Sequence, residues 1–458
     1  MAKISKIILL LAIMISASVH GIIDPSLARA QNGIQFSDTE VINRFPDEMV
    51  FRIIVSSLDA EIESVKFAYT RENLYSSRSY TKDTIAFEPG SEVVLEYTLD
   101  TRDLTTPPLM TYLFYWEVKD SNGNKYQSEP VIIRYEDNRY DWQVLENEDI
   151  GVWWHDRSQA FGQTIFDIAA EAVAAQQDLF QTDLDFQMLI VISNTNEEFN
   201  SWHNIEHDWI GGQTFSDFGI TNQIVQGESY QESWLYGVIP HEISHIFFNH
   251  VVHNPVVSVP VWLNEGVAQY NEFISHEWEI GLVESAAENN TLIPLTSLED
   301  GFGSYDVDRV YLSYAEAYSA VAYLVDTYGS EGLSALLKAY KDGEATDKAF
   351  QNALGISADQ FELDWADSVG AENYQIPTPW VMPTFFPSPT VYTPGEGAST
   401  DSGREPSQTP EPPAPDAPSG EEDLAPRPIR IMPLILLGTI FLLSAGIGFF
   451  ILFRKRNI

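Results

Sequence analysis

The sequence contains no cysteine among its 458 residues. This absence excludes disulfide bonds, a lipid anchor on an N-terminal cysteine and any zinc site built from thiolates. Basic residues are also few, because 25 Lys and Arg stand against 67 Asp and Glu, for a formal net charge of −42. Such a surface repels nucleic acid and anionic lipid headgroups, so we expect no nucleic-acid partner. The 44% of hydrophobic residues is nevertheless ample for packed cores, and the charge is typical of a soluble exported region.

The N-terminus has the pattern of a signal peptide, which we predict to span residues 1–30. Lys3 and Lys6 precede an apolar run over 7–17, and Ala28-Arg29-Ala30 is a small-x-small cleavage site. An uncleaved anchor is the alternative, but the apolar run is short for a membrane span. We therefore expect a mature chain that begins near Gln31 outside the cytoplasm.

The C-terminus has the composition of a stalk and an anchor. Residues 373–430 are rich in Pro, Ser and Glu without apolar periodicity, which predicts a disordered linker. Residues 431–453 carry no charge and are long enough to cross a bilayer, and the basic tail 454–458 favours a cytoplasmic end. A sortase-type tail ends similarly, but no Leu-Pro-x-Thr-Gly motif precedes this one. We predict a single-pass protein of the cell membrane, with its N-terminal ectodomain outside the cytoplasm.

Between these ends the pattern first favours β-structure, over residues 31–140. β-branched and aromatic runs predict strands at 50–55, 64–69, 93–97, 112–116 and 131–135, with a hairpin turn at 120–124. Strands of this length and spacing are typical of an immunoglobulin-like sandwich. This region shows no catalytic constellation, so we expect a spacer or recognition module.

Residues 141–372 change to a mixed α and β pattern. Strands are expected at 150–154 and 186–193, with a long alanine-rich helix over 157–180 between them. Helices are expected at 311–328, 331–340, 347–354 and 358–369. The complete prediction is a multidomain chain: an all-β sandwich, an α+β domain, a disordered stalk and one transmembrane helix.

One stretch of the second region carries a chemical signal. His241 and His245 are four residues apart, so on a helix both imidazoles project from one face. This is the spacing of two ligands of a catalytic zinc, which keeps an open position for water and lowers its pKa. Glu242 lies beside them as a potential general base, and Glu265 in a second helix-like run could complete the ligand set. The alternative is an ordinary helix with two stacked histidines.

The stretches His241-Glu-Ile-Ser-His245 and Trp262-Leu-Asn-Glu-Gly266 resemble gluzincin metallopeptidases, the clan of thermolysin and aminopeptidase N. The similarity is closest to bacterial peptidase MA-like domains, whose motif this chain also matches at Ala268 and Tyr270. The resemblance implies an α+β zincin domain that is thermolysin-like, one Zn²⁺ per chain on His241, His245 and Glu265, and a peptide or protein substrate. It also implies that Glu242 is the general base and that edge strands within 209–225 lie beside the site helix.

The chain departs from these relatives at two points. Gln269 stands where thermolysin-like enzymes place an Asp behind a ligand histidine, so the partner of that histidine is unassigned. The Gly-x-Met-Glu-Asn motif, with which aminopeptidases bind a substrate amino terminus, is missing. The second departure favours an endopeptidase.

A tyrosine stripe follows the motif, because Tyr311, Tyr314 and Tyr318 share one helix face. The stripe either packs onto the core or supplies a hydrogen-bond donor to the developing oxyanion, with Tyr314 as the first choice. The sequence as a whole predicts a membrane-anchored zinc metallopeptidase. The alternative is a catalytically silent peptidase-like ectodomain that serves binding or adhesion.

Overall fold

The computed structural model describes most of the chain between the two predicted membrane-related ends. The described residues are 33–75, 78–203, 211–227, 232–302, 304 and 306–376. The predicted signal peptide, the predicted span and tail, and nearly all of the predicted linker lie outside them. Within the described residues no helix is long and apolar enough to cross a membrane. The chain divides into the units Met1–Pro377 and Thr378–Ile458, and every described residue belongs to the first.

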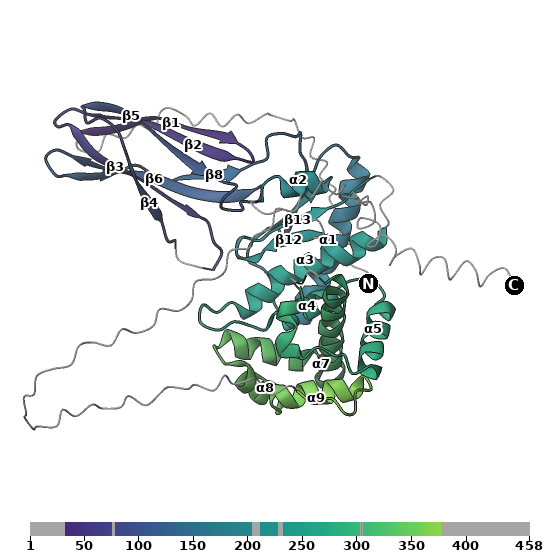
Figure 1. The fold of residues 1–458 in the computed structure, drawn as a ribbon. Coiled ribbons are helices and arrows are strands. Elements are labelled where there is room, and N and C mark those ends of the chain that lie inside the picture. The colour runs from purple at the N-terminus through teal and green to yellow at the C-terminus, as the bar shows by residue number, and fades with distance from the viewer. Residues whose placement is uncertain are drawn as a thin grey trace, which may run out of the picture. The chain divides into compact units, whose positions relative to one another are not determined.

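Residues 34–135 form two antiparallel sheets, here called the β-sandwich (Figure 1). The first sheet has the order β1-β2-β5, with β1 at Ile34–Arg44, β2 at Glu48–Ser57 and β5 at Glu92–Asp100. The second has the order β4-β3-β6-β7, and β8 also pairs with β6. Its strands are β3 at Ile62–Arg71, β4 at Thr81–Ile85, β6 at Met110–Asp120, β7 at Lys125–Gln127 and β8 at Val131–Tyr135.

Alternating apolar residues make the two sheets face each other. Phe51 of β2 lies 4.8 Å from Phe67 of β3 and 4.7 Å from Phe114 of β6, between ring centroids. These rings are fully buried in one cluster to which both sheets contribute. The strands predicted from the sequence are confirmed, and the turn at 120–124 leads into β7 before β8.

A mixed five-stranded sheet follows in the chain. Its order is β12-β13-β11-β10-β9, with β9 at Gln143–Glu146, β10 at Ile150–Trp154, β11 at Met188–Ser193, β12 at Gly212–Phe215 and β13 at Ile220–Ile224. β10, β11 and β13 run parallel, whereas β9 and β12 are antiparallel to their neighbours. Helix α1 (Gln159–Phe180) connects β10 to β11, as a parallel pair requires. The sequence predicted both strands and the helix.

The remaining elements are almost all helical. They are α2 at Asn196–Asn200, α3 at Glu232–Val252, α4 at Val261–Tyr270, α5 at Glu277–Glu288, α6 at Glu299–Phe302, α7 at Val307–Lys341, α8 at Thr346–Leu354 and α9 at Ala358–Ser368. Helix α7 breaks at Gly329, whose φ of 75° is non-helical, so the two helices predicted on either side of this glycine are confirmed. Helix α5 was not predicted from the sequence.

Helices α3, α4 and α7 pack closely around the predicted site, as Figure 1 shows. A Cβ added at Gly266 of α4 would overlap the carbonyl oxygen of Ala317 in α7. Glycine therefore allows the two backbones to approach more closely than any other residue would. Helix α3 is held from the other side by α1, where the stacked rings of Phe180 and Phe247 lie 5.9 Å apart. Gly266 of the motif thus serves the packing of α4 on α7, and that packing places the neighbouring Glu265.

Candidate metal centre

The helix that carries both histidines, α3, begins well before them, at Glu232. Pro240 lies inside α3, one residue before His241. A proline has no N–H, so the carbonyl four residues earlier loses its helical partner. That carbonyl belongs to Tyr236, and it accepts a hydrogen bond of 2.8 Å from the backbone N–H of Phe273 instead. Pro240 thereby creates an attachment point for the chain that follows α4.

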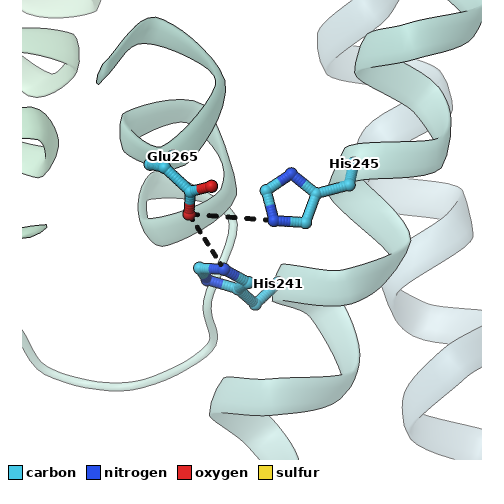
Figure 2. A group of neighbouring side chains, drawn as sticks. All are labelled: His241, His245 and Glu265. Atoms are coloured by element: carbon cyan, nitrogen blue, oxygen red, sulfur yellow. Dashed lines mark ion pairs between the residues drawn. The ribbon is translucent and has the colours of Figure 1, made fainter. Parts of the chain in front are cut away.

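The structure brings the three predicted ligands together. Within the described residues, one group of at least three His, Asp and Glu side chains has donor atoms close enough to share a metal ion: His241, His245 and Glu265, all within 4.8 Å of one another. Figure 2 shows the carboxylate of Glu265 reaching from its helix toward both imidazoles. Its Oε2 lies 3.7 Å from Nε2 of His241 and 3.8 Å from Nε2 of His245.

These distances fit a zinc ion. With zinc–ligand bonds of about 2.0–2.1 Å, the donors of a tetrahedral site lie about 3.4 Å apart. The two distances to Glu265 are slightly wider, and all three donors lie within 4.8 Å of one another, so side-chain rotations would close the group around a cation. Two imidazoles and one carboxylate are the donor set of open catalytic zinc sites.

Each imidazole is oriented through its other nitrogen. Nδ1 of His241 lies 2.9 Å from Oε1 of Glu272, and Nδ1 of His245 lies 3.1 Å from Oδ1 of Asn264. Both partners are oxygen acceptors, so Nδ1 carries the proton in each ring. The lone pair of each Nε2 is then directed at the shared position, as a metal ligand requires.

Three consecutive residues after α4 connect this helix to α3. The side-chain amide of Asn271 donates to Oγ of Ser244 over 2.9 Å. Glu272 accepts from His241, and the N–H of Phe273 donates to Tyr236. We call residues 271–273 the latch segment. It places Glu272, the hydrogen-bond partner of His241, against the face of α3 that carries His241.

The charges around the site reinforce one another. Burial opposes protonation of His241, but its contacts with Glu265 and Glu272 outweigh burial and raise its pKa well above the usual value. Burial also raises the pKa of Glu265, yet the two histidines outweigh it and hold this pKa below its usual value. The carboxylates of Glu265 and Glu272 thus favour positive charge at this position.

Glu242 lies beside the ligands without joining them. Its carboxylate is buried, and Oγ1 of Thr214 in β12 donates to its Oε2 over 2.6 Å. The close approach depends on Gly212, because a Cβ there would lie 2.8 Å from Oε1 of Glu242. The predicted edge strand is therefore confirmed as β12, which lies at one end of the sheet and against α3.

The tyrosine stripe divides in the structure. Tyr318 stacks on His276 at 4.1 Å, and Tyr311 packs edge-on against Trp278 at 5.6 Å. Tyr314 lies nearer the site: burial raises its pKa well above the usual value, and the carboxylates of Glu265 and Glu242 raise it further. Its phenol is therefore protonated and able to donate a hydrogen bond.

Other histidines near the motif lie apart from the ligand group. Tyr75 of the β-sandwich stacks on His253 at 4.7 Å, and its hydroxyl lies 3.4 Å from Nδ1 of His250. His207, which the sequence places near the edge strands, lies outside the described residues.

Sequence reasoning missed the residues that orient the ligands. The carboxylate that orients His241 belongs to Glu272. Gln269, which stands where thermolysin-like enzymes have an Asp, does not take this role. Glu272 lies two residues beyond the end of α4, outside its helical repeat, so local spacing gave no signal for this contact. Asn264, the partner of His245, directly precedes Glu265 in the motif. Thr214 had no local signal in the sequence, because its hydrogen bond to Glu242 depends on how the sheet packs against α3.

Comparison with known proteins defines the class of this region. Residues 168–371 match the sequence model of the Peptidase MA superfamily. This part of the chain is therefore a gluzincin peptidase-like domain. No curated protein sequence matches the chain.

Two solved structures illustrate the remote similarity of the chain to known folds. One is the M1 zinc metallopeptidase from Deinococcus radiodurans, of which a mutant form is 12% identical to this chain. Another solved form of it is 11% identical, with a TM-score of 0.36, and the match covers 76% of this chain and 96% of the metallopeptidase. An aminopeptidase N family protein from Idiomarina loihiensis has 9% identity and a TM-score of 0.33, covering 71% and 72%.

The orientation of His241 by Glu272 can be tested with two neighbouring variants. Glu272→Ala should weaken zinc binding by about 10–100-fold, the typical effect of removing the hydrogen-bond partner of a ligand. Gln269→Ala should leave zinc affinity unchanged. Competition with a chromophoric chelator measures both affinities. Equal losses in the two variants, or a loss confined to Gln269→Ala, would contradict the assignment of Glu272.

Proposed function

We propose that this chain is a zinc-dependent peptidase that hydrolyses peptide bonds. The observation that carries the proposal is the convergence of two Nε2 atoms and one carboxylate oxygen beside a carboxylate that remains outside the ligand set. A site that only stored metal would not need Glu242, which is buried at a cost and held by Thr214. The match to the Peptidase MA superfamily supports the same reaction class.

The residues divide the chemistry among them. Zinc, when bound by His241, His245 and Glu265, supplies a Lewis acid that polarises the peptide carbonyl and lowers the pKa of water. Glu242 accepts the proton of the attacking water and passes it to the leaving amine. Thr214 holds one oxygen of Glu242, which keeps the carboxylate directed into the site.

An endopeptidase is the form of the enzyme that we favour. The outer edge of β12 is unpaired among the described strands, so an extended substrate can add to it by backbone hydrogen bonds. Such pairing serves a polypeptide that continues on both sides of the scissile bond. The missing Gly-x-Met-Glu-Asn motif agrees with this preference.

Replacing the general base separates an enzyme from a silent scaffold. Glu242→Gln keeps the size of the side chain but removes its basicity, so zinc content and thermal stability should stay unchanged. The rate of peptide hydrolysis should fall by about a hundredfold or more, the typical contribution of a positioned base. Turnover of a quenched peptide library, with metal analysis of the same samples, measures both. A variant as fast as the wild type contradicts the mechanism, and a zinc-loaded wild type that cleaves nothing supports the scaffold alternative.

Tyr314 is proposed as a hydrogen-bond donor to the oxyanion that forms during attack. Tyr314→Phe removes only the hydroxyl and should lower kcat by about 10²-fold with little change in KM, since the bond strengthens in the transition state. Tyr311→Phe and Tyr318→Phe are matched controls from the same helix face and should retain kcat. Unchanged kcat in Tyr314→Phe would return this tyrosine to a packing role.

We further propose that the peptidase is exported and tethered to the membrane by residues 431–453. The support is the uncharged run followed by Arg454-Lys455-Arg456, behind an N-terminus of signal-peptide pattern. A chain shortened to end at Pro428 should be released as active soluble protein, whereas the full chain should require detergent. Membrane association of the shortened chain at high salt would show that the anchor lies elsewhere.

A further inference from the structure

Strand β12 depends on its surroundings for its position. It is four residues long, and among the described strands it pairs with β13 only. A short edge strand opens more easily than a central strand, because its backbone is bonded on one side only. Yet Thr214 of this strand holds the carboxylate of Glu242, and its free edge is where an extended substrate would pair. Whatever fixes the end of β12 therefore bears on the proposed reaction.

The chain leaves β12 through a single tight turn, Ser216–Phe218, which we call the exit turn. Two side-chain hydrogen bonds attach this turn to helix α3. Oγ of Ser216 donates to the carbonyl of His245 over 3.0 Å. The carboxylate of Asp217 accepts from the side-chain amide of Asn249 over 3.0 Å. The exit turn thus keeps the end of β12 against the helix that carries the histidine ligands.

The β-sandwich holds the same turn from another side. The backbone N–H of Leu74, which follows β3, donates to the carbonyl of Asp217 over 2.9 Å. The guanidinium carbon of Arg71, the last residue of β3, lies 5.2 Å from the centre of the Phe218 ring, within the range of a cation–π contact. Both contacts are made with the exit turn itself. The end of β12 is therefore held between α3 and the β-sandwich.

The next residue of the β-sandwich extends this attachment to the end of α3. The ring of Tyr75 stacks on that of His253, with 4.7 Å between their centres and 21° between their planes. Its hydroxyl lies 3.4 Å from Nδ1 of His250. Arg71, Leu74 and Tyr75 together hold the exit turn and the end of α3, and we call these three residues the sandwich clasp.

The clasp has a fixed support, because the β-sandwich shares a core with the mixed sheet. Phe199 and Trp202 of α2 and Ile220 and Ile224 of β13 belong to the same buried cluster as the rings of the sandwich. A chain without the β-sandwich would expose these four side chains to water. Point substitutions in the full chain, and not deletion of the β-sandwich, therefore isolate the effect of the clasp.

We propose that the sandwich clasp is a positioning element of the peptidase: it fixes the exit turn and so keeps β12 in place for Glu242 and for an extended substrate. This inference rests on the proposed peptidase function. It adds a role for the β-sandwich, for which the sequence indicates only a spacer or recognition module. The clasp acts on the reaction through β12 and α3 and does not itself touch the reacting atoms.

Hydrogen exchange of the full-length, zinc-loaded protein tests the clasp without requiring activity. Tyr75→Ala and His253→Ala remove one ring contact from its two sides, so each should speed amide exchange in residues 212–218 by about fivefold. The double variant should show no further increase. Tyr75→Phe keeps the ring and should retain wild-type exchange. Tyr80→Ala is the matched control, because Tyr80 also lies between β3 and β4 and is half-buried, but packs on Tyr115 within the β-sandwich.

A series of peptide substrates of increasing length tests the consequence for catalysis. A long peptide can pair along β12, whereas a short one contacts only the neighbourhood of the scissile bond. Tyr75→Ala and His253→Ala should lower the ratio of kcat/KM for long over short peptides by about fivefold, the typical contribution of one hydrogen bond. Tyr75→Phe and Tyr80→Ala should keep the wild-type ratio. A loss of folded protein would lower both values of kcat/KM equally and leave their ratio unchanged.

The two measurements separate the possible failures. Unchanged exchange of residues 212–218 in the folded variants would overturn the clasp and leave the peptidase intact. Faster exchange with an unchanged length ratio would overturn its role in catalysis. No cleavage by the zinc-loaded wild type would instead overturn the proposed function and the catalytic role of the clasp with it. If Tyr75→Ala does not fold, His253→Ala carries both measurements.

Discussion

Three donor atoms on two helices can share one small cation only if those helices are fixed relative to each other. Glu265 lies on α4 and the histidines lie on α3, so every other feature of the centre depends on this pairing. Close packing against α7 through Gly266 sets the position of α4 from behind. The latch segment, residues 271–273, ties the end of α4 back to α3 by three separate hydrogen bonds. The most consequential of these is the bond from the N–H of Phe273 to the carbonyl of Tyr236. It exists because Pro240 leaves that carbonyl without a partner inside the helix.

Three glutamates in this site have three different environments. Glu265 lies between two imidazoles, Glu272 faces the far nitrogen of His241, and Glu242 is bonded to Thr214 of the sheet. The environment of each carboxylate suits one role: metal ligand, orienting partner of a ligand, and general base. The sheet edge contributes to catalysis in this account, because β12 both holds the base and offers its backbone to substrate.

The donor residues could be predicted from sequence because their signal is local. A spacing of four residues fixes the relative direction of His241 and His245 in any helix, and the motif around Glu265 carries the third donor. Glu272 could not be assigned because its contact requires a hydrogen bond between Phe273 and a carbonyl far earlier in the chain. Tyr314 shared its stripe with two other tyrosines, and its position near the carboxylates of Glu265 and Glu242 distinguishes it only in three dimensions. Strands of the β-sandwich followed from alternation of apolar residues, whereas helix α5 was missed.

X-ray absorption at the zinc edge of the purified protein tests the central claim most directly, because it reports the number and type of ligands. The account predicts one zinc per chain with nitrogen and oxygen donors at about 2.0–2.1 Å, including two imidazoles. The signal of one imidazole should disappear in His245→Ala and persist unchanged in His250→Ala. A preparation that binds no zinc, or a zinc whose spectrum is the same in wild type and His245→Ala, would contradict the account.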